Sequence, residues 1–182
     1  MKVGLPLWIA HASNAPHGLA PLLLVLNSVM VVALQVPLAR FGATTAAARN
    51  LLVPHSAAVA LGGVTMALSA TGGPLTATLL LTAAAAAFTM AEMLHATASW
   101  ELSVALAHDT SLGSYLGVHG LAQSAQRSIG PLAVTAAIVT GPIGWTAFGS
   151  TIALTCLIQR RLVRDRLAQP PLSVPPVTVS EH

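Results

Sequence analysis

Long apolar runs, separated by short polar or turn-forming segments, dominate the sequence. The runs are continuous and roughly twenty residues long, which is the length of helix that crosses a hydrocarbon core of about 30 Å. Membrane β-barrels show shorter segments of alternating polarity, and none is found here. The pattern predicts an all-α, polytopic transmembrane helix bundle with five full spans, at about residues 18–39, 51–68, 75–97, 115–139 and 143–158.

The two ends of the chain do not fit a full span. Residues 1–15 combine a lysine, a short apolar centre and small residues, an outline shared by a secretory signal peptide and by the outer part of a helix whose first half is missing. About thirteen residues at 1.5 Å each reach only some 20 Å, so we expect a partial amino-terminal helix. Residues 169–182 are rich in Pro, Val and Ser and are predicted to form a disordered cytoplasmic tail, which leaves 1–168 as the transmembrane bundle.

Composition agrees with a lipid-embedded protein. Of the 182 residues, 54% are hydrophobic and 7% are charged, and the mean hydropathy is +0.75. These values lie outside the usage of soluble domains, so the expected surroundings are the lipid bilayer of the plasma membrane. With 4% aromatic residues and much Ala, Gly, Ser and Thr, the helices are expected to pack through small side chains, and Trp145 is expected at the headgroup level.

The basic residues predict the orientation of the chain. Four of the eight follow the last apolar run, which places the carboxyl terminus in the cytoplasm, beside anionic lipid, and argues against nucleic-acid binding. The link 40–50 carries two arginines and is also expected inside, whereas the uncharged turn 69–74 is expected outside. The link after the third span should be cytoplasmic too, yet it carries Glu101 and Asp109 and no basic residue. The four basic residues are Arg160, Arg161, Arg164 and Arg166.

Polar side chains between the apolar runs are the candidates for function, and they concentrate in residues 91–131. A charge at membrane depth costs about 2.5–3.5 kcal/mol on insertion scales, so it usually faces a bundle interior or a water-filled path. Glu92 lies on a polar stripe of the third span. On the fourth span, His119, Gln123 and Arg127 follow one another at i, i+4 and i+8, and therefore share a face.

The first span adds Asn27 and Gln35, which stand two turns apart on one face. Two interpretations remain open for this pair: hydrogen bonding between helices, or a stripe that faces a substrate.

Two further faces of the fourth span have expected roles. An apolar stripe is expected to face lipid, and a small-residue face is expected to contact neighbouring helices closely. The apolar stripe consists of Val118, Ala122, Ala125, Ile129 and Leu132, and the small-residue face of Gly113, Gly117, Gly120 and Ser124.

No motif indicates an enzyme. Glu92 and His95 have the Glu-x-x-His spacing of di-iron bundles, but such a site needs a second copy and further carboxylates, and the chain has five acids in all. No nucleophile elbow, phosphate loop or zinc-binding His-Glu-x-x-His occurs. Cys156 lies inside an apolar run and is expected to be an inert packing residue. We therefore expect no catalytic residue, no cofactor and no metal site.

The order of these features resembles the carboxyl-terminal half of a major facilitator superfamily transporter. The runs GPLTATLLL, AEMLHATASW and LAHDTSLGSYLGVHGLAQSAQRSIGP look like helices ten and eleven of that family. The opening VGLPLWIAHASNAP and the run LLLVLNSVMVVALQVPLARFG look like the end of helix seven and helix eight of drug-efflux-type members. Residues 3–166 would then correspond to the second half of the fold.

Three departures from the family accompany the resemblance. Leu112 stands where an arginine usually precedes the Gly-x-Tyr-x-Gly segment, and the acidic residue of the loop between helices eight and nine is absent around Arg40. The first half of the fold is also absent, although in this family the substrate path lies between two halves.

The resemblance implies a secondary transporter, or one half of one, for proton-coupled efflux of a small and amphipathic molecule. Glu92 would carry the proton, because a carboxyl shielded from water is pushed towards its neutral form and can exchange its charge. The expected partners are the small-molecule substrate and either a second half or a second copy in a homodimer. The alternative is a transport-incompetent membrane remnant or an assembly partner of a separately encoded half. The residues expected to line the path with Glu92 are Arg127, Gln123, His119, Asn27 and Gln35.

Overall fold

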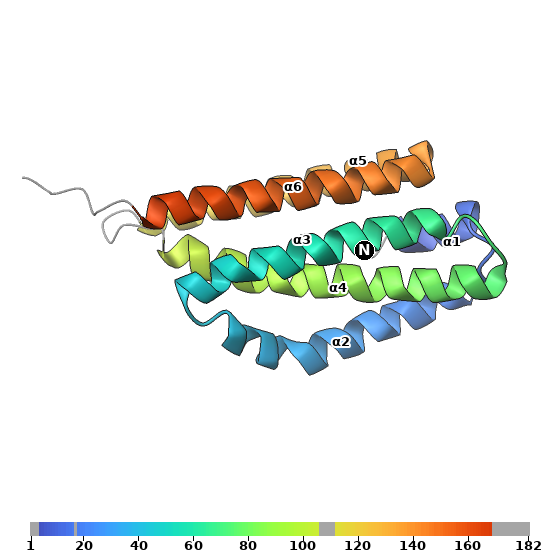
Figure 1. Cartoon of the computed structure of the whole chain (residues 1–182), viewed down its shortest axis with the longest axis horizontal. Helices are drawn as coiled ribbons and strands as arrows, with labels where there is room; N and C mark the ends of the chain where they lie inside the picture. The colour runs from blue at the N-terminus through green and yellow to red at the C-terminus, as the bar shows by residue number, and fades with distance from the viewer. Residues whose placement is uncertain (1–3, 17, 106–111, 169–182) are drawn as a thin grey trace, which may run out of the picture.

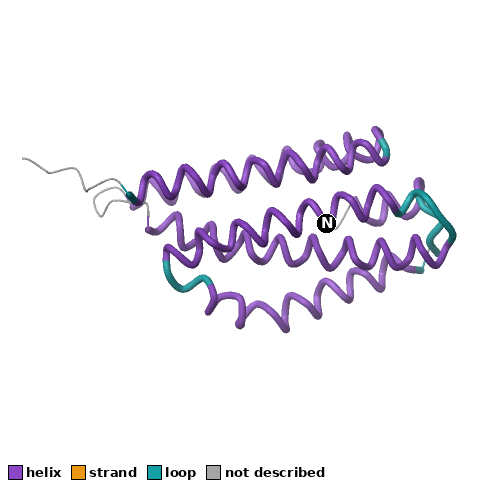
Figure 2. Tube along the Cα trace, in the orientation of Figure 1, coloured by secondary structure: helices purple, strands orange, loops and turns teal. Residues whose placement is uncertain are grey.

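The computed structural model describes residues 4–16, 18–105 and 112–168. These residues form helices joined by short connections, and no strand occurs among them (Figure 2). The prediction of an all-α fold is therefore confirmed. The helices are α1 (Gly4–Ala12), α2 (Leu19–Phe41), α3 (Thr45–Leu68), α4 (Pro74–Ala105), α5 (Leu112–Thr140) and α6 (Pro142–Leu167).

The long helices lie side by side as an elongated bundle (Figure 1). Helix α3 packs between α4 and α6, α4 also packs against α2, and α5 packs on α6. The turn from α5 into α6 is tight: Gly141 has φ of +75°, which favours glycine, and Pro142 opens α6 at a position where its missing N–H costs nothing.

Three helices, α2, α3 and α4, are long and apolar enough to cross a membrane. This finding supports a membrane protein. Helix α5 is less hydrophobic than these three because its first half is polar. Helix α6 is less hydrophobic because Gly, Ser and Thr lower the mean hydropathy of the part that precedes the arginines.

Several helices extend beyond the predicted spans. Helix α3 begins at Thr45 rather than near Leu51, because Thr44 is extended and its Oγ1 accepts a 3.3 Å hydrogen bond from the backbone N–H of Ala47. At the other end of the chain, α6 continues to Leu167, so the four arginines predicted to follow the last span lie on its final turns. The predicted tail, residues 169–182, lies outside the described residues.

The main core gathers at the end of the bundle that holds α1. Trp8 is 1% exposed and Trp145 is 3% exposed, and their rings meet edge to face with centroids 5.8 Å apart. Trp145 also packs against Phe88 and Phe148. The indole of Trp145 therefore packs in the core between α1, α4 and α6, and its expected depth at the headgroup level stays a prediction.

Small residues do bring helices together, but not all of them where the sequence predicts. A Cβ atom at Gly63 of α3 would lie 2.7 Å from the carbonyl oxygen of Trp145 and 3.1 Å from the Cα of Gly149, so α3 and α6 touch through backbone. On α5, by contrast, a Cβ atom at Gly113, Gly117 or Gly120 would meet nothing within 4 Å. The predicted close contact at this face is not made within the described chain.

Candidate functional site

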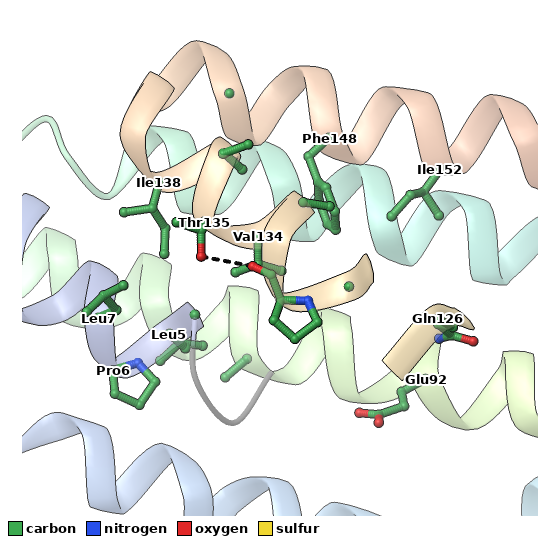
Figure 3. Close-up of a pocket in the computed structure, with 18 of the residues that line it drawn as sticks. Leu5, Pro6, Leu7, Glu92, Gln126, Val134, Thr135, Ile138, Phe148 and Ile152 are labelled. Atoms are coloured by element: carbon green, nitrogen blue, oxygen red, sulfur yellow. Dashed lines mark hydrogen bonds between the residues drawn. The ribbon is translucent and has the colours of Figure 1, made fainter. Parts of the chain in front are cut away.

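A cavity of about 1520 Å³ lies among the helices in the described part of the chain. Residues of α1, α2, α4, α5 and α6 line it, so five helices contribute to its wall. Most of this wall is apolar. Figure 3 shows Glu92 of α4 and Gln126 of α5 towards one side of the cavity, and Leu5, Leu7 and Ile138 towards the other.

Three of the predicted path residues meet at this cavity. Asn27 reaches it from α2, Glu92 from α4 and Arg127 from α5. Asn27 is half-buried, whereas Glu92 and Arg127 are exposed. Because these residues are far apart in sequence, their convergence is a property of the helix packing.

The other three predicted residues are placed differently. Gln35 lines a second cavity of about 520 Å³, which Glu92 and Glu101 also line, so Glu92 stands between the two hollows. Gln123 is exposed on α5, one turn before Arg127, and is not among the described residues that line either cavity. His119 lies on α5, but its side chain is outside the described part of the structure.

The amide of Asn27 is held by α4. Thr89 is fully buried, and its Oγ1 lies 2.8 Å from Asn27 Oδ1 and 2.8 Å from the carbonyl oxygen of Ala85. A hydroxyl has one proton and donates it to one acceptor. The Thr89 hydroxyl therefore has two acceptors within reach, Asn27 Oδ1 and the carbonyl oxygen of Ala85. Asn27 thus fits both of its predicted roles, since it bonds α2 to α4 and also lines the cavity.

The charges in the cavity are of both signs. In the described ranges, the one ion pair within 4.0 Å joins Arg164 and Asp165, so Glu92 and Arg127 share the cavity without forming a salt bridge. A molecule in the cavity would therefore meet a carboxylate on one wall and a guanidinium on another.

The Glu-x-x-His motif is divided between two environments. Glu92 lines the cavities, whereas the ring of His95 lies 5.3 Å, centroid to centroid, from the buried ring of His55 on α3. His55 Nδ1 is 2.8 Å from the carbonyl oxygen of Ala91, which can only accept, so Nδ1 carries the proton. Among the described residues, no group of three or more His, Cys, Asp or Glu side chains gathers in one place.

The face of α5 that was predicted to meet lipid contributes two residues to the cavity wall. Ala125 and Ile129 belong to its wall together with Arg127. Both residues are also exposed, so their assignment to lipid stays a prediction. The cavity borders α5 over more than one face. Sequence reasoning also missed Gln126 and the bridging role of Thr89, although Thr89 belongs to the same polar stripe of α4 as Glu92.

Comparison of the chain with family models, with curated proteins and with solved structures found no match.

Proposed function

We propose that the chain is one half of a secondary transporter of the major facilitator type, with five full spans, that moves a small amphipathic molecule across the cell membrane. The observation that carries the proposal is the large cavity at which Asn27, Glu92 and Arg127 converge from three helices. A concave, mostly apolar wall with a few polar groups is the usual form of a small-molecule site.

Each polar residue has a role in this proposal. The Glu92 carboxyl exchanges a proton during the cycle, because an ionisable group at membrane depth responds strongly to changes in its access to water. Asn27 offers an amide whose position is fixed, since the Thr89 hydroxyl donates to its Oδ1. Arg127 faces the same space with the opposite charge. The apolar part of the substrate contacts residues such as Val31 and Ile138.

The proposal requires a second protein surface that covers α5 and completes the path. The polar positions of α5 around Arg127 are exposed in the single chain, and a membrane would leave them against hydrocarbon unless protein covers them. A separately encoded half or a second copy would supply that cover and close the path between two halves. The carboxyl terminus lies in the cytoplasm in this arrangement.

One observation favours the alternative of an assembly partner that does not itself transport. The glycine face of α5 has no neighbour within the described chain, although such faces normally allow two helices to approach closely. A membrane subunit whose role is to dock against another helix would carry the same feature.

The test is a pair of measurements on the purified chain. In liposomes with a proton gradient we expect no driven movement of a cationic dye, and Glu92→Gln should behave like the wild type, because one wall is missing. In detergent we expect saturable binding of tetraphenylphosphonium that weakens at low pH, with the pH dependence lost in Glu92→Gln and kept in Glu101→Gln. Binding that is absent in all variants would favour the non-transporting alternative. Robust proton-driven dye movement by the chain alone, lost in Glu92→Gln, would overturn the half-transporter proposal.

A further inference from the structure

Charge is concentrated at one end of the bundle. The described residues carry ten formally charged side chains, seven arginines and three acids, and all but Glu92 and Arg127 lie near the end where α2 and α4 finish, α3 begins and α6 finishes (Figure 1). Among the described residues at this end there are six arginines and two acids, so the end is strongly basic. The six are Arg40, Arg49, Arg160, Arg161, Arg164 and Arg166, and the two acids are Glu101 and Asp165.

Two of these arginines come from helices that pack together. Ala48 and Leu52 of α3 share a buried cluster with Val163 of α6, and Ala98 and Leu102 of α4 complete that cluster. The residue after Ala48 is Arg49, and Arg160 stands one helical turn before Val163. Both arginines therefore border the same junction of α3 and α6.

One guanidinium nitrogen of each arginine at this junction lacks an acceptor in the described part of the chain. The Nε atoms of Arg49 and Arg160 are buried and have no hydrogen-bond partner among the described residues. A buried donor without an acceptor costs about 1–3 kcal/mol, and more for a charged group, so native proteins rarely leave one unpaired. Arg164 is different, because its Nε donates to Asp165 Oδ1 at 3.1 Å. The two arginines therefore carry hydrogen-bond donors that the described chain does not satisfy, and an anionic acceptor from outside the chain would satisfy them.

Exposed apolar side chains at this end of the bundle favour a lipid over a soluble anion. Leu162 of α6 is 61% exposed, and Phe41 of α2 (68% exposed) and Trp100 of α4 (60% exposed) lie at the same end of the bundle. Exposed aromatic and aliphatic side chains beside arginines are typical of the boundary between the hydrocarbon and headgroup layers. A soluble phosphate would explain the arginines but would not favour this apolar fringe.

We propose that the junction of α3 and α6 binds the phosphate headgroup of an anionic phospholipid. Arg49 and Arg160 donate to the phosphate oxygens, and the exposed Arg161 adds positive charge beside them. Arginine suits this role because its planar group presents paired N–H donors to a phosphate. The proposal does not depend on transport, since it concerns the end of the bundle and not the cavity.

The test compares two phospholipids with identical acyl chains. The full-length chain is purified in detergent, mixed with equal amounts of phosphatidylglycerol and phosphatidylcholine, and studied by native mass spectrometry. We expect phosphatidylglycerol to be retained in preference. The double variant Arg49→Gln/Arg160→Gln should weaken this preference by about tenfold. The matched control, Arg40→Gln/Arg166→Gln, removes the same charge from the same end and should retain the preference.

Three outcomes would overturn the proposal. Equal retention of the two lipids by the wild type would exclude selective binding. An equal loss in the control variant would show diffuse attraction by total charge rather than a site. Displacement of the lipid by millimolar inorganic phosphate would identify a soluble anion as the ligand. If the double Gln variant loses its helical circular dichroism, Arg49→Lys/Arg160→Lys takes its place, and it should weaken the preference because it keeps the charge but not the paired donors.

Discussion

The indole Nε1 of Trp8 donates a 2.9 Å hydrogen bond to Oγ of Ser69, across 61 positions of sequence. Both residues are 1% exposed, and Ser69 Oγ in turn donates to the carbonyl oxygen of Met66 at 2.6 Å. This chain of two hydrogen bonds joins the short helix α1 to the end of α3, and it supplies the partner that a buried indole needs.

Ser69→Ala should destabilise the protein by about 1–3 kcal/mol, because it leaves the indole N–H of Trp8 buried without an acceptor. Urea or SDS titration of the purified chain in mixed micelles, followed by tryptophan fluorescence, measures the change. Thr71→Ala is the control, since the Thr71 hydroxyl is exposed and bonds the backbone of its own helix end. The cost of Ser69→Ala should shrink in a Trp8→Phe background, where no N–H remains to be left unpaired. Equal costs in both backgrounds would show that the hydrogen bond contributes nothing.

Gly63→Ala should lower the thermal stability of the chain, because its new Cβ would press on the backbone of α6 at Trp145 and Gly149. The atoms that the Cβ would meet belong to the backbone, so no flexible side chain can move to make room for it. Gly117→Ala is the matched control on α5, where the added methyl group meets open space and improves helix propensity by up to about 1 kcal/mol. Melting followed by circular dichroism should separate the two variants, and a Gly117→Ala protein that melts as low as Gly63→Ala would contradict the described position of α5.

Thr89→Val should weaken the contact between α2 and α4 by about 0.5–1.5 kcal/mol, since it removes the hydroxyl that holds Asn27. The shape of the side chain is nearly unchanged, so packing alone predicts little effect. Thr82→Val is the control because the Thr82 hydroxyl bonds Thr78 of its own helix at 2.8 Å. The same denaturant titration applies to both variants. If Thr82→Val loses as much stability as Thr89→Val, the hydrogen bond to Asn27 does not explain the effect.

The helices were predictable from sequence because hydrophobicity and length dominate that signal in a membrane protein. The polar stripe that carries Thr89 and Glu92 was also visible, since both residues recur with helical spacing on one element. The partners of these residues were not predictable: that Thr89 meets Asn27, and that His95 meets His55, depends on the rotation of α4 against α2 and α3. Likewise, glycine content predicts where helices can approach closely but not which ones do, and Gly63 has a neighbour whereas Gly117 has none.

The orientation of the chain remains a prediction that labelling can check. Arg40 and the arginines of α6 lie at one end of the bundle and the turn between α3 and α4 at the other, so the positive-inside rule places residue 43 in the cytoplasm and residue 73 outside. Gly73→Cys and Ala43→Cys suit the experiment in a Cys156→Ala background. Gly73 has open space around it, and Ala43 is exposed and leaves the Thr44 cap intact. An impermeant maleimide applied to intact cells should label position 73 at once and position 43 after the membrane is opened. Labelling in the reverse order would show that the arginines face outward and that the assigned orientation is wrong.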